Sequence, residues 1–140
     1  MENLIINKSI VLNTDAATLW KVLTTPEYTQ KYMFNCAVKS HWKPGCCIEW
    51  RGHYQGYDAY QKGTVVEIEP LHKLAYTTFD PNFGLPDVPE NYLTVTYELK
   101  PVPEGIELLL STSGFNGNQQ RCEHTAAGWD QVINNLSKLF

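Results

Sequence analysis

The stretch GWDQVINNLSKLF, residues 128–140, decides the fold. Its apolar side chains recur at i, i+3, i+7 and i+10, the spacing of one helix face: Trp129, Val132, Leu136 and Leu139. Thr125, Ile133 and Phe140 flank this stripe, and polar side chains occupy much of the other side. The pattern predicts an amphipathic helix over roughly the last 20 residues, long enough at about 1.5 Å per residue to cross a whole sheet.

Upstream of this helix, between residue 34 and Ser113, the helical spacing is absent. The clearest β-type run covers residues 92–99, where four apolar side chains alternate with threonines and a glutamate: Leu93, Val95, Tyr97 and Leu99. Similar short runs cover residues 46–51, 63–69, 74–79 and 106–112, with turn signals between them. Short β-rich runs separated by turns indicate an antiparallel meander.

The N-terminal third mixes one strand with two helices. Residues 5–12 alternate in polarity and predict a half-buried strand. Thr14 or Asp15 then offers an N-cap for a helix over residues 16–23, and Pro26 stands in the first turn of a second helix reaching about residue 33.

This order of elements predicts an α+β fold. The apolar face of a one-sided sheet must be covered, and the terminal helix is the largest cover available. We therefore expect residues 1–140 to form one domain of the helix-grip type, with a curved antiparallel sheet wrapped around the C-terminal helix and two short helices after the first strand.

Composition and charge argue against nucleic acid as a partner, against a membrane span and against secretion. The net charge is −4, from 15 acidic and 11 basic side chains without a basic cluster, which argues against nucleic acid as a partner. No apolar run approaches the roughly 20 residues of a membrane span, and the first residues lack a secretory signal. A cytoplasmic location is expected, with four free thiols: Cys36, Cys46, Cys47 and Cys122.

Four motifs in order along the chain resemble one known family. They are LWKVLTTPE at residues 19–27, WKPG at residues 42–45, GTVVEIEP at residues 63–70 followed by Leu74, and the Gly128-Trp129 pair with its following leucines. This pattern resembles the homologues of the activator of heat-shock-protein-90 ATPase, in the START-like superfamily. Departures are Thr24-Thr25 in place of Thr-Asp, and Tyr32-Met33-Phe34 where many members carry a Trp-Phe or Trp-Trp pair.

The resemblance implies a cavity between the sheet and the long helix. The candidates for lining it are aromatic and helix residues: Trp50, Tyr76, Phe79, Tyr92, Tyr97, Gly128, Trp129, Val132, Ile133 and Leu136. The alternative for each ring is that it simply fills the core. Gly128 is unfavourable inside a helix, so it predicts the close approach of a bulky group, either Trp20 or a ligand.

Metal and catalytic signals are weak. His41, Cys46, Cys47 and His53 lie close in sequence, but adjacent cysteines on a strand point to opposite faces, and neither a metal site nor a cofactor is predicted. An enzyme of this superfamily would use polar cavity groups, for which the candidates are Glu49, Arg51, His53, Tyr76 and Tyr92. For His53 an exposed loop position is the favoured interpretation.

Three functions remain open at this stage. The leading hypothesis is non-catalytic binding of a small hydrophobic or aromatic ligand. The alternatives are a chaperone-associated module, by family analogy, and a cyclase- or hydrolase-like enzyme. The irregular stretch at residues 80–91 is interpreted as a lid, a partner contact or an ordinary packed loop, and a homodimer also stays open.

Overall fold

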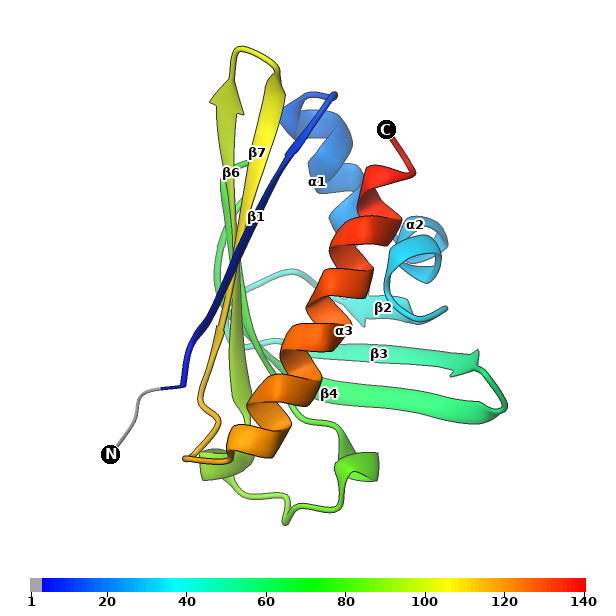
Figure 1. Ribbon diagram of the computed structural model, residues 1–140, viewed down its shortest axis with the longest axis vertical. Helices are drawn as coiled ribbons and strands as arrows, with labels where there is room; N and C mark the ends of the chain where they lie inside the picture. Colours follow the sequence, from blue (N-terminus) through cyan, green and yellow to red (C-terminus); the bar gives the residue numbers. More distant parts are fainter. Residues whose placement is uncertain (1–3) are drawn as a thin grey trace.

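A seven-stranded antiparallel sheet wraps around one long helix in the computed structural model, which describes residues 4–140 (Figure 1). The elements are β1 (Ile6–Leu12), α1 (Ala16–Thr24), α2 (Pro26–Tyr32), β2 (Ala37–Ser40), β3 (Cys47–Tyr54), β4 (Tyr57–Glu69), β5 (Lys73–Thr78), the 3-10 turns η1 (Pro81–Phe83) and η2 (Pro89–Asn91), β6 (Leu93–Val102), β7 (Gly105–Ser113) and α3 (Gln119–Ser137). The predicted α+β helix-grip, or START-like, fold is confirmed.

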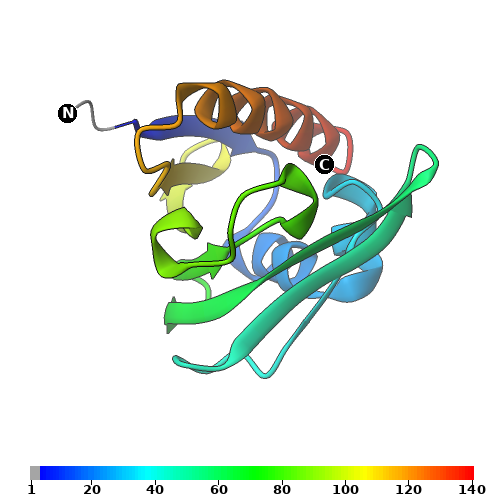
Figure 2. The ribbon, with the colours of Figure 1, turned by 90° about the horizontal axis from the view of Figure 1, so that it is seen from below.

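The sheet is a meander closed by its first strand. Its order is β1-β7-β6-β5-β4-β3-β2, so every neighbour pair except β1–β7 is also consecutive in sequence. Strand β4 is long enough to take part in both halves of the sheet, and a register shift between Val65 and Glu67 marks its bend. At Gly63 a Cβ atom would lie 1.7 Å from the Thr77 carbonyl oxygen, so this bend requires glycine. Figure 2 shows the resulting curl, with β3 and β4 crossing beneath α3.

The concave face of the sheet carries the core. In β6 the alternation is as predicted, with four side chains buried on this face: Leu93, Val95, Tyr97 and Leu99. Strand β7 supplies Ile106, Leu108 and Leu110 on the same side. Helix α3 covers this face with Trp129, Val132 and Leu136, the buried members of the predicted stripe.

The two short helices close one end of the structure. The Asp15 carboxylate accepts a 2.7 Å hydrogen bond from the Thr18 N–H and caps α1, which lowers the pKa of Asp15. Thr25 precedes α2 but its side chain makes no capping bond, while Pro26 stands in the first turn as predicted. The buried Tyr32 hydroxyl donates to the Leu23 carbonyl at 2.8 Å and ties α2 to α1.

The β3–β4 hairpin differs from the sequence prediction. Its two strands were expected to end at residue 51 and begin at residue 63, but they continue to Tyr54 and start again at Tyr57 around a two-residue turn. Strand β2 was not predicted either. The reason is that no side chain between residues 51 and 62 is fully buried and most of them are polar, so the stretch lacks the apolar alternation by which a half-buried strand is recognised.

The remaining chain-wide expectations concern cysteines and membranes. All four cysteines are free thiols, with Cys36 buried and Cys47 exposed. Within residues 4–140 no helix has the length and apolar character needed to cross a membrane.

Candidate functional site

A cavity of about 420 Å³ lies between α3 and the concave face of the sheet. This is within the usual size range of small-molecule sites. Its lining comes from α3, from β3 to β7 and from two loops: Met33, Phe34, Trp50, Tyr54, Gln55, Tyr57, Gln61, Tyr76, Thr78, Asp80, Phe83, Leu93, Val95, Thr112, Arg121, His124, Thr125, Ala127, Gly128, Trp129, Gln131 and Val132.

Helix α3 presents one face to the cavity. The lining residues Arg121, Thr125, Gly128, Trp129 and Val132 recur at i, i+4, i+7, i+8 and i+11, which places them in one stripe. The stripe changes character along the helix, from a cation at the N-terminal end to apolar side chains at the other. The helix therefore provides both a polar and an apolar wall.

Gly128 leaves the middle of this stripe open. A methyl group built on it would meet a single side chain, the ring of Phe34 at 3.8 Å, which is ordinary van der Waals contact. The predicted alternative of close packing by Trp20 is therefore wrong. The space over the helix backbone at this position belongs to the cavity.

The floor of the cavity is a set of packed aromatic rings on the sheet. Trp50 and Tyr76 have ring centroids 5.8 Å apart, and Tyr76 and Tyr97 lie 5.7 Å apart at 74°. The hydroxyls of Tyr76 and Tyr97 share a 2.8 Å hydrogen bond. Burial raises the pKa of both tyrosines, so both stay neutral at any physiological pH. Tyr97 packs edge-on against Tyr76 and does not line the cavity itself.

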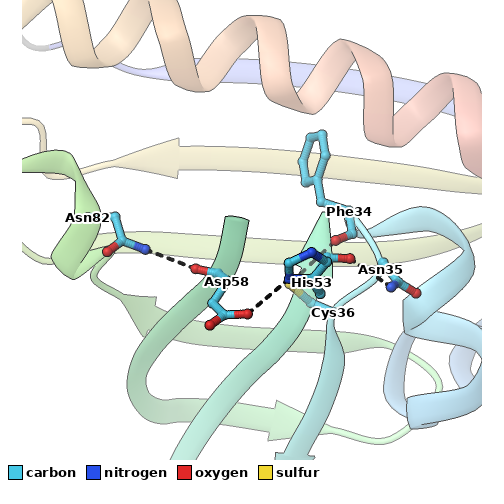
Figure 3. Close-up of polar contacts among 6 residues, drawn as sticks. All are labelled: Phe34, Asn35, Cys36, His53, Asp58 and Asn82. Carbon is cyan, nitrogen blue, oxygen red and sulfur yellow. Dashed lines mark hydrogen bonds and ion pairs between the residues drawn. The ribbon is translucent and has the colours of Figure 1, made fainter. Parts of the chain in front are cut away.

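The loop after α2 builds one side of the cavity mouth. Phe34 points toward α3 (Figure 3). Its ring meets the ring of Tyr54 edge-on, with centroids 5.4 Å apart. The Asn35 side-chain amide donates to the His53 carbonyl at 2.9 Å. At Gly52 a Cβ atom would lie 2.1 Å from the Asn35 carbonyl oxygen, so only glycine lets this loop approach β3 so closely.

The loop of residues 80–91 forms another wall. Phe83 lines the cavity and lies 5.9 Å from the ring of His124. The loop is held on β4 by the ion pair of Lys62 with Asp87. A hydrogen bond from Lys62 lowers the pKa of Asp87, so this pair is charged on both sides. Within this loop, Asp80 and Phe83 are the residues that line the cavity.

Arg121 is the buried charge of the cavity. It is 3% exposed, and its Nη1 donates to the Asn91 carbonyl at 2.7 Å. Burial lowers the pKa of Arg121, and nearby Asp80 opposes this shift. No ion pair joins Arg121 to any carboxylate of residues 4–140. The guanidinium has five N–H donors, and most of them make no hydrogen bond within residues 4–140.

Two further buried polar atoms in the cavity wall lack a partner. They are the indole Nε1 of Trp129 and the hydroxyl of Thr112, and neither is hydrogen-bonded within residues 4–140. An unpaired buried donor costs about 1–3 kcal/mol, so such atoms are rare without a reason.

Half of the predicted lining residues do line the cavity: Trp50, Tyr76, Gly128, Trp129 and Val132. The other half do not: Phe79, Tyr92, Tyr97, Ile133 and Leu136. Phe79 directly follows Thr78, and Tyr92 directly precedes Leu93. Thr78 and Leu93 line the cavity, so the period of two along a strand turns Phe79 and Tyr92 to the other side, where their ring centroids lie 5.1 Å apart.

The candidates for a catalytic role separate by the same rule. Of the five, only Tyr76 lines the cavity, because Glu49, Arg51 and His53 alternate with the inward Trp50 and face outward. His53 lies in β3, not in a loop as expected. It is exposed and pairs with Asp58 across the hairpin at 3.0 Å (Figure 3). The ionisable groups that an enzyme could use are instead Asp80, Arg121 and His124.

Comparison with known proteins agrees with this architecture. The solution structure of ChR145 from Cytophaga hutchinsonii is 34% identical and has a TM-score of 0.80, over 99% of this chain and 95% of that one. The crystal structure of MLL2253 from Mesorhizobium loti is 23% identical with a TM-score of 0.76, over 96% and 95%. The Aha1 dimer from Colwellia psychrerythraea is 16% identical with a TM-score of 0.74, over 95% and 92%.

Among curated proteins, the search found no match. The family model described as activator of Hsp90 ATPase homolog 1-like protein matches residues 13–140, nearly the whole chain. The chain therefore belongs to the activator of Hsp90 ATPase homolog 1-like family, as its four motifs indicated.

Proposed function

We propose that this protein binds a small hydrophobic or aromatic molecule in the cavity between the sheet and α3, without converting it. The observation that carries the proposal is the cavity of about 420 Å³, with aromatic walls contributed by Trp50, Tyr76 and Phe83. Rings with a few polar atoms among them suit a flat or lipidic ligand, since the rings bury its body and the polar atoms orient it.

The position of Gly128 supports the same proposal. A glycine inside a helix lowers stability by about 1 kcal/mol relative to alanine, yet nothing in the structure fills the space that the missing methyl group leaves. A ligand lying across the helix backbone gives this residue a role.

The experiment combines native mass spectrometry with thermal-shift screening against lipids and aromatic metabolites. Gly128→Leu projects a side chain into the cavity and is expected to abolish the shift that a hit produces. Asn134→Leu places the same side chain on the exposed side of α3 and serves as the matched control. The proposal fails if no compound stabilises the protein, or if both variants respond to a hit like the unmodified protein.

Association with a chaperone is a second candidate, favoured by the family match alone. Co-purification with a heat-shock-protein-90 chaperone, or a change in its ATPase rate, would support this role; the absence of both would dispose of it. That residues 1–140 form a single domain also stays a proposal, and limited proteolysis yielding one resistant core tests it.

A further inference from the structure

Arg121 has the properties of a ligand-binding cation. A buried guanidinium is normally neutralised by a carboxylate, because removing an unpaired charge from water is costly. Within residues 4–140 its side chain is in contact with the Asn91 carbonyl at 2.7 Å and with the ring of Phe83 at 5.7 Å. Asp80 lines the same cavity but lies beyond ion-pair distance. The charge is thus held in the wall with Asp80 nearby, but with no carboxylate of residues 4–140 in ion-pair contact.

Two more donors lie in the same wall. Trp129 is 7% exposed and its Nε1 can only donate a hydrogen bond, while Thr112 is fully buried and its hydroxyl can donate or accept. Neither has a partner within residues 4–140. The Trp129 indole therefore requires an acceptor, as the free N–H groups of Arg121 do, whereas the Thr112 hydroxyl can be satisfied by either a donor or an acceptor.

The spacing of these groups says how a ligand would lie. Arg121 and Trp129 are eight residues apart on α3, which corresponds to about 12 Å along the helix axis. Thr125 and Gly128 line the cavity between them, and Gly128 leaves that stretch of backbone open. A ligand reaching both ends would run along α3 with its apolar body over Gly128 and against the rings of the sheet.

We propose that the ligand is an amphipathic organic acid, whose acid group is bound by Arg121 and whose apolar body lies along α3 toward Trp129. This inference rests on the proposed ligand-binding function. Arginine suits the role better than lysine, because its planar fork of donors matches the two oxygens of a carboxylate. Asp80 at the same end would repel a ligand with a second acid group, so a monoacid fits.

A matched pair of fluorescent probes tests the charge preference. 8-Anilinonaphthalene-1-sulfonate carries an acid group, whereas N-phenyl-1-naphthylamine has the same rings without it. Both are titrated into the unmodified protein, Arg121→Met, Arg121→Lys and the control Arg51→Met, which removes an exposed cation from the outer side of β3. Circular dichroism confirms that each variant is folded.

The expected result is selective. Arg121→Met lowers the affinity for the sulfonate probe about 10- to 100-fold and the affinity for the neutral probe less than about 3-fold, while Arg51→Met leaves both affinities unchanged. Arg121→Lys keeps the charge but not the fork, and is expected to fall between the unmodified protein and Arg121→Met.

A measurement on the unmodified protein covers the case in which Arg121→Met does not fold. In an amide and indole NMR spectrum, the Trp129 indole N–H and the Arg121 side-chain N–H signals are expected to shift with the sulfonate probe. The neutral probe is expected to leave the Arg121 signal in place. Trp129→Phe assigns the indole signal.

The outcomes separate the two proposals. If both probes bind, and Gly128→Leu blocks both, but Arg121→Met weakens them by the same factor, the acid preference is overturned and the ligand-binding function stands. If neither probe binds, or Gly128→Leu affects neither, the cavity is not the site and both proposals fall.

Discussion

Replacing Gly128 by alanine is expected to make the unliganded protein more stable. A Cβ atom at this position would meet only the Phe34 ring, at 3.8 Å, so the methyl group enters without displacing anything. The gain is then the difference in helix propensity, about 0.8–1 kcal/mol. For a domain of this size that corresponds to a rise of roughly 3–5 °C in the melting temperature.

Urea unfolding followed by circular dichroism measures this change, with thermal unfolding as a second readout. Ala127→Gly, at the neighbouring position of the same helix, is the matched control and is expected to lower stability by about the same amount. A loss of stability in Gly128→Ala would refute the reasoning, because it would mean that the helix backbone is in closer contact here than the structure shows.

Three further perturbations test the wall of the cavity. Gly52→Ala is expected to destabilise the protein by roughly 2–4 kcal/mol in urea unfolding, since its methyl group would collide with the Asn35 carbonyl oxygen, 2.1 Å away; a change below about 1 kcal/mol would contradict that contact. Tyr76→Phe and Tyr97→Phe are each expected to lower the free energy of unfolding by about 1–2 kcal/mol, because each leaves the other hydroxyl unpaired. The double variant should lose less than the sum of the two single losses. Strict additivity of the two losses would argue against the 2.8 Å hydrogen bond between the hydroxyls. Burial, assisted by Asp80, raises the pKa of the Cys36 thiol from 9.0 to about 11, so the stabilisation from its neutral form is complete below about pH 9 and is lost as the pH rises through about 11. At pH 8 iodoacetamide should therefore modify the exposed Cys47 well before Cys36, as peptide mass spectrometry would show, and equal rates would count against this environment.

The fold followed from the sequence because its signals are periodic. Each pattern predicts one apolar face: the alternation in residues 92–99 predicts a face of the sheet, and the stripe through Trp129 and Leu136 predicts a face of the helix. Two apolar faces are buried when they pack against each other. The β3–β4 hairpin tip could not be predicted in the same way, because none of its side chains is fully buried and its sequence has no such pattern.

The cavity could be predicted only in part. Aromatic character identifies Tyr76 and Trp129, but it also selects Phe79 and Tyr92, which do not line the cavity. Strand alternation separates them, because Phe79 is adjacent to the inward Thr78 and Tyr92 to the inward Leu93.

Other lining residues have a weak sequence signal or none. Arg121 has a weak signal, because it is a cation at the start of the helical stripe that continues through Thr125 and Gly128. Phe34 gave none, since its place at the mouth depends on a loop that folds against β3 at Gly52.

The pairing of β1 with β7 also bears on the order in which the protein folds. Ile6 pairs with Thr112, so this contact joins opposite ends of the sequence, whereas every other strand pair is a hairpin between consecutive strands. Closing so long a loop carries a large entropic cost, and local hairpins form faster. The meander should therefore be present in the folding transition state before β1 and α3 dock, and the ligand cavity should come into existence only at this last step. A bound ligand would then slow unfolding by holding α3 against the sheet, with little effect on the rate of folding.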